Sequence, residues 1–107
     1  MSDNLVDKIV TILENKKALD IQVIDISGKS TLADTMIVAS GTSSTHIKSL
    51  SDNVYEDLKK EGIQAYHVEG YNSNSWILMD YSDVIVNIFT VEDRELYNLE
   101  DLWKKMR

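Results

Sequence analysis

The sequence contains no cysteine and no proline. Without cysteine there is no disulfide framework, thiol nucleophile or thiolate metal site. Without proline no helix is broken from within. No apolar run approaches the roughly 18 residues of a membrane span, and the first apolar residues are interrupted by Asp7, Lys8 and Glu14, unlike those of a signal peptide. We therefore expect a cytoplasmic protein with no membrane segment.

Positive charge is missing from one long stretch. No Lys or Arg lies between Lys60 and Arg94, and these 33 residues supply −6 of the net charge of −7 through Glu61, Glu69, Asp80, Asp83, Glu92 and Asp93. The same stretch holds the most apolar part of the sequence, residues 76–89. Acidic groups on a stiff sheet suit a basic partner and disfavour phosphate. Buried strands would also exclude lysine, so charge alone leaves both interpretations open.

The chain is short enough to be one domain over residues 1–107. Apolar residues between 5 and 13 recur with helical spacing and predict a first helix ending near Lys17. Alternation predicts a strand over 18–26, and a continuous apolar segment predicts a strand over 35–40 that is covered on both faces. Ser43 or Ser44 can cap a second helix, which ends at Gly62.

The second half of the sequence predicts more strands than helices. A strand is expected over about 64–69, and two strands over 76–81 and 84–89 are joined at Ser82 and Asp83 by the shortest hairpin link. A last helix follows Thr90, with Leu96, Leu99, Leu102 and Trp103 on one side. The order α-β-β-α-β-β-β-α predicts an α/β fold, a mixed five-stranded sheet with helices on both faces.

The segment 41–45 (Gly-Thr-Ser-Ser-Thr) lies between a buried strand and a helix, where catalytic and phosphate-binding turns occur. It lacks the second glycine of a nucleophile elbow and the lysine of a P-loop. A Gly-Thr-Ser turn is also found in nucleotidyltransferases, which add two carboxylates on a neighbouring strand to hold Mg²⁺. The next strand here offers only Glu69. We therefore favour a helix-capping turn and expect no catalytic residues.

Other candidate sites are weaker. His46 and His67 are 21 residues apart without cysteine, so we expect no metal site and no cofactor. Lysine pairs fall at helix ends with no basic stripe, so little direct nucleic-acid contact is expected. Asp80 and Asp83 are typical turn residues, although on a rigid tip beside Tyr81 they can also pair with Arg or Lys. Trp103 is expected in the core, whereas Trp76 follows a polar loop and fits either the core or a partner anchor.

Several short segments together resemble a known family. Their order and spacing closely resemble the ribosomal silencing factor family, also called Iojap-related proteins, over about residues 3–103. No single motif is decisive, and the joint order is specific. The segments are residues 18–21 with Asp25, 30–34, 41–43, 68–70, 76–83 and 95–103.

The resemblance implies a nucleotidyltransferase-like sheet that has lost its catalytic carboxylates. It also implies a translational repressor, active in starvation or stationary phase, that binds the large ribosomal subunit through ribosomal protein fourteen and blocks joining of the small subunit. It allows a homodimer of the free protein. Carried over to this chain, the partner-binding surface comprises Glu69, Trp76, Met79, Asp80, Tyr81 and Asp83, with Arg94 and Tyr97 on the adjoining helix.

This chain departs from the family pattern at the hairpin. The family usually has glycine where Ser82 stands and histidine where Asn87 stands. Serine adopts a tight turn less freely than glycine, which affects how Asp83 is presented. Two other functions stay open: a large-subunit assembly factor that uses the same surface, and a nucleotidyltransferase-type enzyme.

Overall fold

The computed structural model describes residues 2–28 and 33–97. A five-stranded sheet has the order β1-β2-β5-β4-β3. Only β2 and β5 are parallel; the other neighbouring pairs are antiparallel. In chain order the elements are α1 (Ser2–Asn15), β1 (Leu19–Asp25), β2 (Thr35–Gly41), α2 (Ser44–Lys60), β3 (His67–Glu69), β4 (Trp76–Asp80), β5 (Val84–Thr90) and α3 (Val91–Tyr97).

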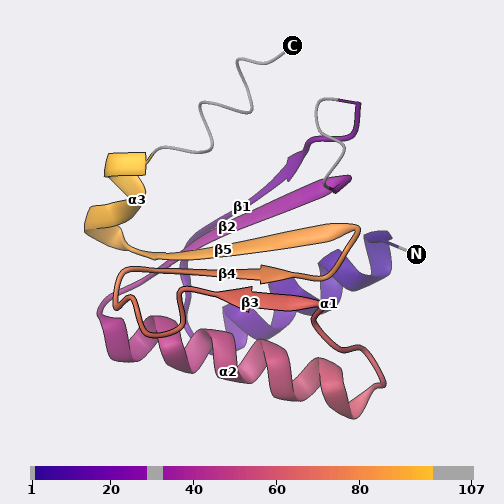
Figure 1. Cartoon of the computed structure of the whole chain (residues 1–107), viewed down its shortest axis with the longest axis horizontal. Helices are drawn as coiled ribbons and strands as arrows, with labels where there is room; N and C mark the ends of the chain where they lie inside the picture. Colours follow the sequence, from indigo (N-terminus) through magenta and orange to yellow (C-terminus); the bar gives the residue numbers. More distant parts are fainter. Residues whose placement is uncertain (1, 29–32, 98–107) are drawn as a thin grey trace.

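Helices lie on both faces of the sheet (Figure 1). The helices α1 and α2 pack side by side beneath one face, and α3 lies at one end of the sheet on the opposite side, against β2 and β5. The mixed sheet and the two-sided helix arrangement confirm the predicted fold class. None of the helices in the described residues is long and apolar enough to cross a membrane.

The second helix begins and ends where the sequence predicts. Ser43 has extended backbone angles, and its Oγ accepts a hydrogen bond from the His46 N–H at 3.1 Å. Lys59 and Lys60 occupy the last turn, where cations suit the helix dipole, and Gly62 follows with a positive φ of 82°. The predicted apolar face of the helix is buried: Ile47, Leu50, Val54 and Leu58.

The main core lies between this helix layer and the sheet. Ile9 and Leu13 of α1 join the buried face of α2 against alternate residues of β2, β4 and β5. A smaller cluster lies on the other face and includes Ile24, Met36, Val38 and Phe89. Buried residues on both faces of β2 explain its continuous apolar run.

Two predicted elements extend beyond what the structure describes or pairs. The third strand is shorter than predicted, at three residues, because only His67–Glu69 pairs with β4. The prediction that Leu99, Leu102 and Trp103 continue the last helix falls outside the described residues.

Candidate partner-binding surface

Strand β4 divides the predicted site residues between two faces. Directly paired residues of an antiparallel sheet point to the same side. Glu69 pairs with Leu78, and His67 pairs with Asp80. Alternate residues of one strand also share a side, so the face of the sheet opposite α1 and α2 carries His67, Glu69, Trp76, Leu78 and Asp80. We call these five residues the β3–β4 face.

Met79 and Tyr81 lie on the opposite side of the sheet. Met79 is fully buried, and its Sδ is 3.5 Å from the buried Ser51 Oγ of α2. Tyr81 is buried in the same cluster, with 5% of its surface exposed. Neither side chain offers surface to a partner in this conformation. Met79 and Tyr81 are therefore not part of the partner-binding surface that we propose below.

Trp76 lies partly buried at the start of β4. Its ring stacks on Phe89, with centroids 4.9 Å apart and an interplanar angle of 26°. Its indole Nε1–H donates to Asn87 Oδ1 at 2.9 Å. The side-chain amide of Asn87 thus holds the tryptophan in place. Trp76 packs on the sheet and also lines its surface, and its role as a partner anchor stays a prediction.

The hairpin tip after β4 is held by hydrogen bonds. Asp80 Oδ1 accepts from the Ser82 N–H at 2.8 Å, as expected for a turn aspartate. The Asp83 carbonyl accepts from the N–H groups of Asp34 and Thr35 at 3.0 and 3.1 Å. Asp83 is exposed, and Asp80 is partly exposed. The tip therefore presents two carboxylates on a rigid support.

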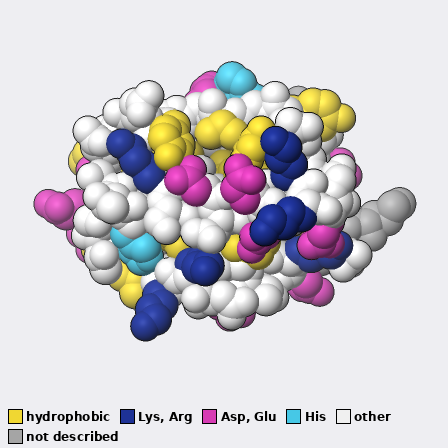
Figure 2. All heavy atoms as spheres, turned by 90° about the horizontal axis from the view of Figure 1, so that it is seen from below, with side chains coloured by type: hydrophobic (Ala, Val, Ile, Leu, Met, Phe, Trp, Pro, Cys, Tyr) yellow, Lys and Arg dark blue, Asp and Glu magenta, His cyan; other side chains and the backbone are white. Residues whose placement is uncertain are grey.

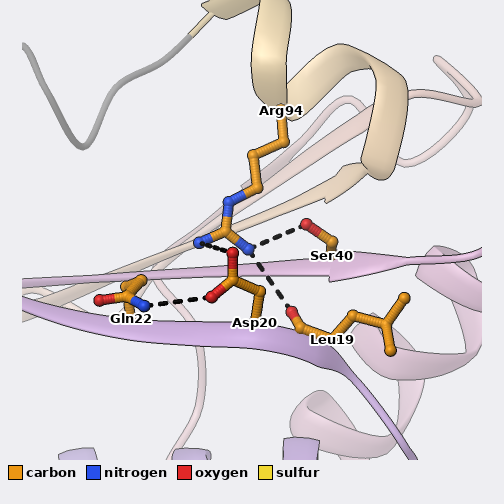
Figure 3. A network of polar contacts seen from close by, with 5 residues as sticks. All are labelled: Leu19, Asp20, Gln22, Ser40 and Arg94. Atoms are coloured by element: carbon orange, nitrogen blue, oxygen red, sulfur yellow. Dashed lines mark hydrogen bonds and ion pairs between the residues drawn. The ribbon is translucent and has the colours of Figure 1, made fainter.

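Arg94 is an internal anchor rather than a surface residue. It is 7% exposed and donates through Nη1 to Ser40 Oγ at 2.9 Å and to the Leu19 carbonyl at 3.4 Å (Figure 3). Its Nη2 lies 3.7 Å from Asp20 Oδ2, and Asp20 has a positive φ of 48°. These contacts fasten α3 to β1 and β2. Tyr97 ends α3, and its side chain lies outside the described residues.

The Gly41 turn is explained by helix packing. A Cβ at Gly41 would come within 2.7 Å of Ile47 Cγ2, so the turn approaches α2 too closely for any side chain. The Thr42 N–H already donates to His46 Nδ1 at 2.9 Å, and Ser43 Oγ caps the helix. Within residues 2–28 and 33–97, no group of three or more His, Asp or Glu residues is placed to hold a metal ion. The turn thus has a structural role that accounts for its residues.

The two faces of the molecule differ in charge. Figure 2 shows the face formed by α1 and α2, where Lys and Arg side chains are interspersed with Asp and Glu. The β3–β4 face carries the carboxylates of Glu69 and Asp80, and its strands come from the stretch without Lys or Arg. Sequence reasoning missed Leu78 on this face, although its even spacing from Trp76 and Asp80 is the signal that places it there.

Comparison with known proteins decides the family. A family model described as "Ribosomal silencing factor during starvation" matches residues 1–107. The chain belongs to the ribosomal silencing factor family. It is 38% identical over 99 residues to the ribosomal silencing factor of Haemophilus influenzae, covering 92% of this chain and 97% of that protein. The family model and this relative are both named for silencing of the ribosome, which is a regulatory role, and not for a reaction.

Two further relatives extend the comparison. A crystal structure of a Chromobacterium violaceum protein superposes with a TM-score of 0.92 at 33% identity, covering 95% of this chain and 85% of that one. A mouse protein named "Mitochondrial assembly of ribosomal large subunit protein 1" is 29% identical over 101 residues, covering 92% of this chain and 44% of that protein. The fold therefore recurs in another bacterial protein, and the sequence similarity extends to an animal protein.

Proposed function

We propose that this protein represses translation by binding the large ribosomal subunit through ribosomal protein fourteen, which blocks joining of the small subunit. The membership in the silencing factor family supports a ribosomal partner. The observation that carries the finer proposal is the β3–β4 face with the adjacent Asp83. There, the exposed Glu69 and the partly exposed Asp80 share one face of the sheet with Trp76 and Leu78, and the exposed Asp83 follows at the hairpin tip. We propose no cofactor, no metal and no reaction for this function, and we place it in the cytoplasm.

The chemistry of this face suits a basic protein surface. Apolar groups at the centre of a contact supply most of the binding free energy, and Trp76 and Leu78 are placed for that role. The carboxylates of Glu69, Asp80 and Asp83 would sit near the rim, where charge raises the association rate and sets specificity. Because such contacts are screened by ions, we expect the affinity to fall with salt.

The proposed mechanism requires only that the bound protein be large enough to occupy space that the small subunit needs. A folded domain seated on the subunit-joining surface excludes the small subunit by steric overlap. The resemblance also allows a homodimer of the free protein, which remains a prediction. A dimer built on the β3–β4 face would compete with ribosome binding, so dilution would favour the active monomer.

Charge reversal tests the proposed surface. We expect Glu69→Lys combined with Asp83→Lys to weaken binding to purified large subunits by about tenfold or more, because two favourable contacts become repulsive. Binding is measured by co-sedimentation at two salt concentrations. Asp80 is left intact in this variant because its Oδ1 holds the hairpin turn.

A matched variant controls for net charge. Glu14→Lys with Glu56→Lys makes the same change in charge at exposed positions of α1 and α2. We expect this control to bind as the unmodified protein does. If both variants lose binding equally, or if the folded Glu69/Asp83 variant binds undiminished, the assignment of the surface is wrong.

The mouse relative's name supports a second candidate function, assembly of the large subunit. The two functions predict different ribosome profiles in stationary-phase cells that lack the protein. Loss of a repressor leaves normal large subunits and more joined ribosomes. Loss of an assembly factor leaves immature large subunits that sediment abnormally.

A further inference from the structure

A pocket of about 290 Å³ opens at the Trp76 end of β4. It is lined by Glu69, Gly70, Ser73, Ser75, Trp76 and Leu78. It lies at the lower limit of the roughly 300–1,000 Å³ typical of small-molecule sites. Its size suits one long side chain better than a cofactor. Its position on the β3–β4 face makes it part of the surface proposed to meet the partner.

The loop that forms one wall is rigidly held. Ser73 Oγ donates to the Trp76 carbonyl at 2.8 Å and accepts from the Trp76 N–H at 3.1 Å. Gly70 has a positive φ of 76°, and a Cβ there would lie 2.2 Å from the Trp76 carbonyl oxygen. The pocket is therefore preorganised, which lowers the entropy cost of binding.

A second tether connects the same loop to α2. The Tyr71 hydroxyl donates to Asp52 Oδ2 at 3.1 Å, and Lys48 Nζ lies 5.7 Å from the centre of the Tyr71 ring. The hydrogen bond to Asp52 raises the pKa of Tyr71 above its usual range, as expected for a hydroxyl that donates to a carboxylate. The loop is thus fixed at both of its sides, on Trp76 and on α2.

The lining combines one negative charge with flat apolar surface. Among the described residues that line the pocket, Glu69 is the only one with an ionisable carboxylate, and 58% of its side chain is exposed. Its Oε2 lies 3.0 Å from His67 Nε2, and among the described residues no Lys or Arg forms an ion pair with its carboxylate. Trp76 and Leu78 provide the apolar walls. A carboxylate beside an indole is the chemistry that recognises a cation on a long aliphatic stem.

We propose that this pocket binds a single arginine side chain of the basic partner, an inference that rests on the proposed function. Arginine fits better than lysine because its planar guanidinium can lie against the Trp76 ring and pair side-on with the Glu69 carboxylate. Lysine offers only a compact, strongly hydrated charge. The pocket anchors the partner, and the surrounding carboxylates orient it.

Titration with a small probe tests the pocket without the ribosome. The full-length protein, labelled with ¹⁵N, is titrated with N-acetyl-arginine amide while the Trp76 indole N–H and the Gly70 amide are followed by NMR. We expect saturable shifts confined to the pocket. N-acetyl-citrulline amide has nearly the same shape without the charge, and we expect it to bind at least about tenfold more weakly. Equal binding of the two probes, or shifts outside the pocket, would overturn the proposal.

A neutral, isosteric variant extends the test to the partner. Glu69→Gln should abolish the preference for arginine over citrulline and weaken large-subunit binding by about five- to tenfold. Glu56→Gln on α2 is the matched control and should change neither. If the probe binds as expected but the subunit does not, the proposed function fails and the pocket stands. If the unmodified protein binds large subunits but does not prefer the arginine probe, or if Glu69→Gln binds large subunits normally, the pocket proposal fails alone.

Discussion

The two sides of strand β4 perform different tasks over the same five residues. Ile77 and Met79 point toward α1 and α2 and are fully buried. Trp76, Leu78 and Asp80 point to the other side and are only partly buried. A step of one residue therefore separates the core from the proposed binding surface. Both sides belong to the segment without Lys or Arg. Burial excludes lysine from the inward side, and on the outward side the absence of lysine keeps the surface negatively charged.

The two sides of β4 lack positive charge for different reasons, so the charge pattern of the sequence does not distinguish them. The inward side has no room for a charge, because burying an unpaired ammonium costs several kcal/mol. The outward side could accommodate a charged side chain. Because β3 and β4 contain no Lys or Arg, these strands offer no such partner to Glu69 and Asp80. Of the two sides, only the outward one is accessible to a partner.

The largest expected effect separates Met79 from Leu78. We expect Met79→Ala to lower the free energy of unfolding by about 2–5 kcal/mol, because it leaves a cavity in the core. Leu78→Ala should cost less than about 1.5 kcal/mol, because its side chain is already partly solvated. Urea denaturation followed by circular dichroism measures both. Binding to large subunits should show the reverse order, with Leu78→Ala weaker than folded Met79→Ala.

Met79→Leu is the control for the core variant. It nearly conserves volume and should cost less than about 1.5 kcal/mol. If Met79→Ala and Leu78→Ala destabilise the protein equally, the two sides of β4 do not differ as the structure has them.

Tyr81 gives an intermediate effect on the inward side. Within the described part of the chain, its buried hydroxyl has no hydrogen-bond partner. Burial and then the nearby Tyr55 raise the pKa of Tyr81 to about 12. Tyr81→Phe removes an unsatisfied polar group, so we expect it to leave the protein equally stable or to stabilise it by up to about 1 kcal/mol at neutral pH.

The same variant should change the alkaline limb of the stability curve. In the unfolded chain the tyrosine ionises near its ordinary pKa of about 10, whereas in the folded protein it holds its proton to about pH 12. The unfolded state thus binds fewer protons in this window, and stability falls as pH rises, by at most about 1.4 kcal/mol per unit. Tyr81→Phe should flatten this fall between pH 10 and 12. Identical slopes would show that Tyr81 is solvated in the fold.

Sequence patterns predicted the helices and strands better than they predicted which residues share the proposed binding surface. Helix periodicity and the Ser43 cap located α2 because both depend on local chemistry. The site depends on which strands pair and on their register, and these contacts are distant in sequence. Strict alternation would still have separated Trp76 and Asp80 from Met79 and Tyr81. The burial of Arg94 depends on β1 and β2 meeting α3, which no local pattern reveals.

The smallest expected effect lies at Ser82, where the inward and outward residues of β4 end in one turn. Ser82 has a positive φ of 74°, a conformation that costs an L-residue about 1–2 kcal/mol. Glycine removes this strain but loses about 0.5–1 kcal/mol more backbone entropy on folding. We expect Ser82→Gly to stabilise the protein by about 0.5 kcal/mol and to raise the melting temperature by about 2–4 °C. Thr45→Gly in the first turn of α2 is the control and should lower it, because helical φ gives glycine no advantage. A lower melting temperature for Ser82→Gly would mean that the serine side chain supports the hairpin, and with it the position of Asp83.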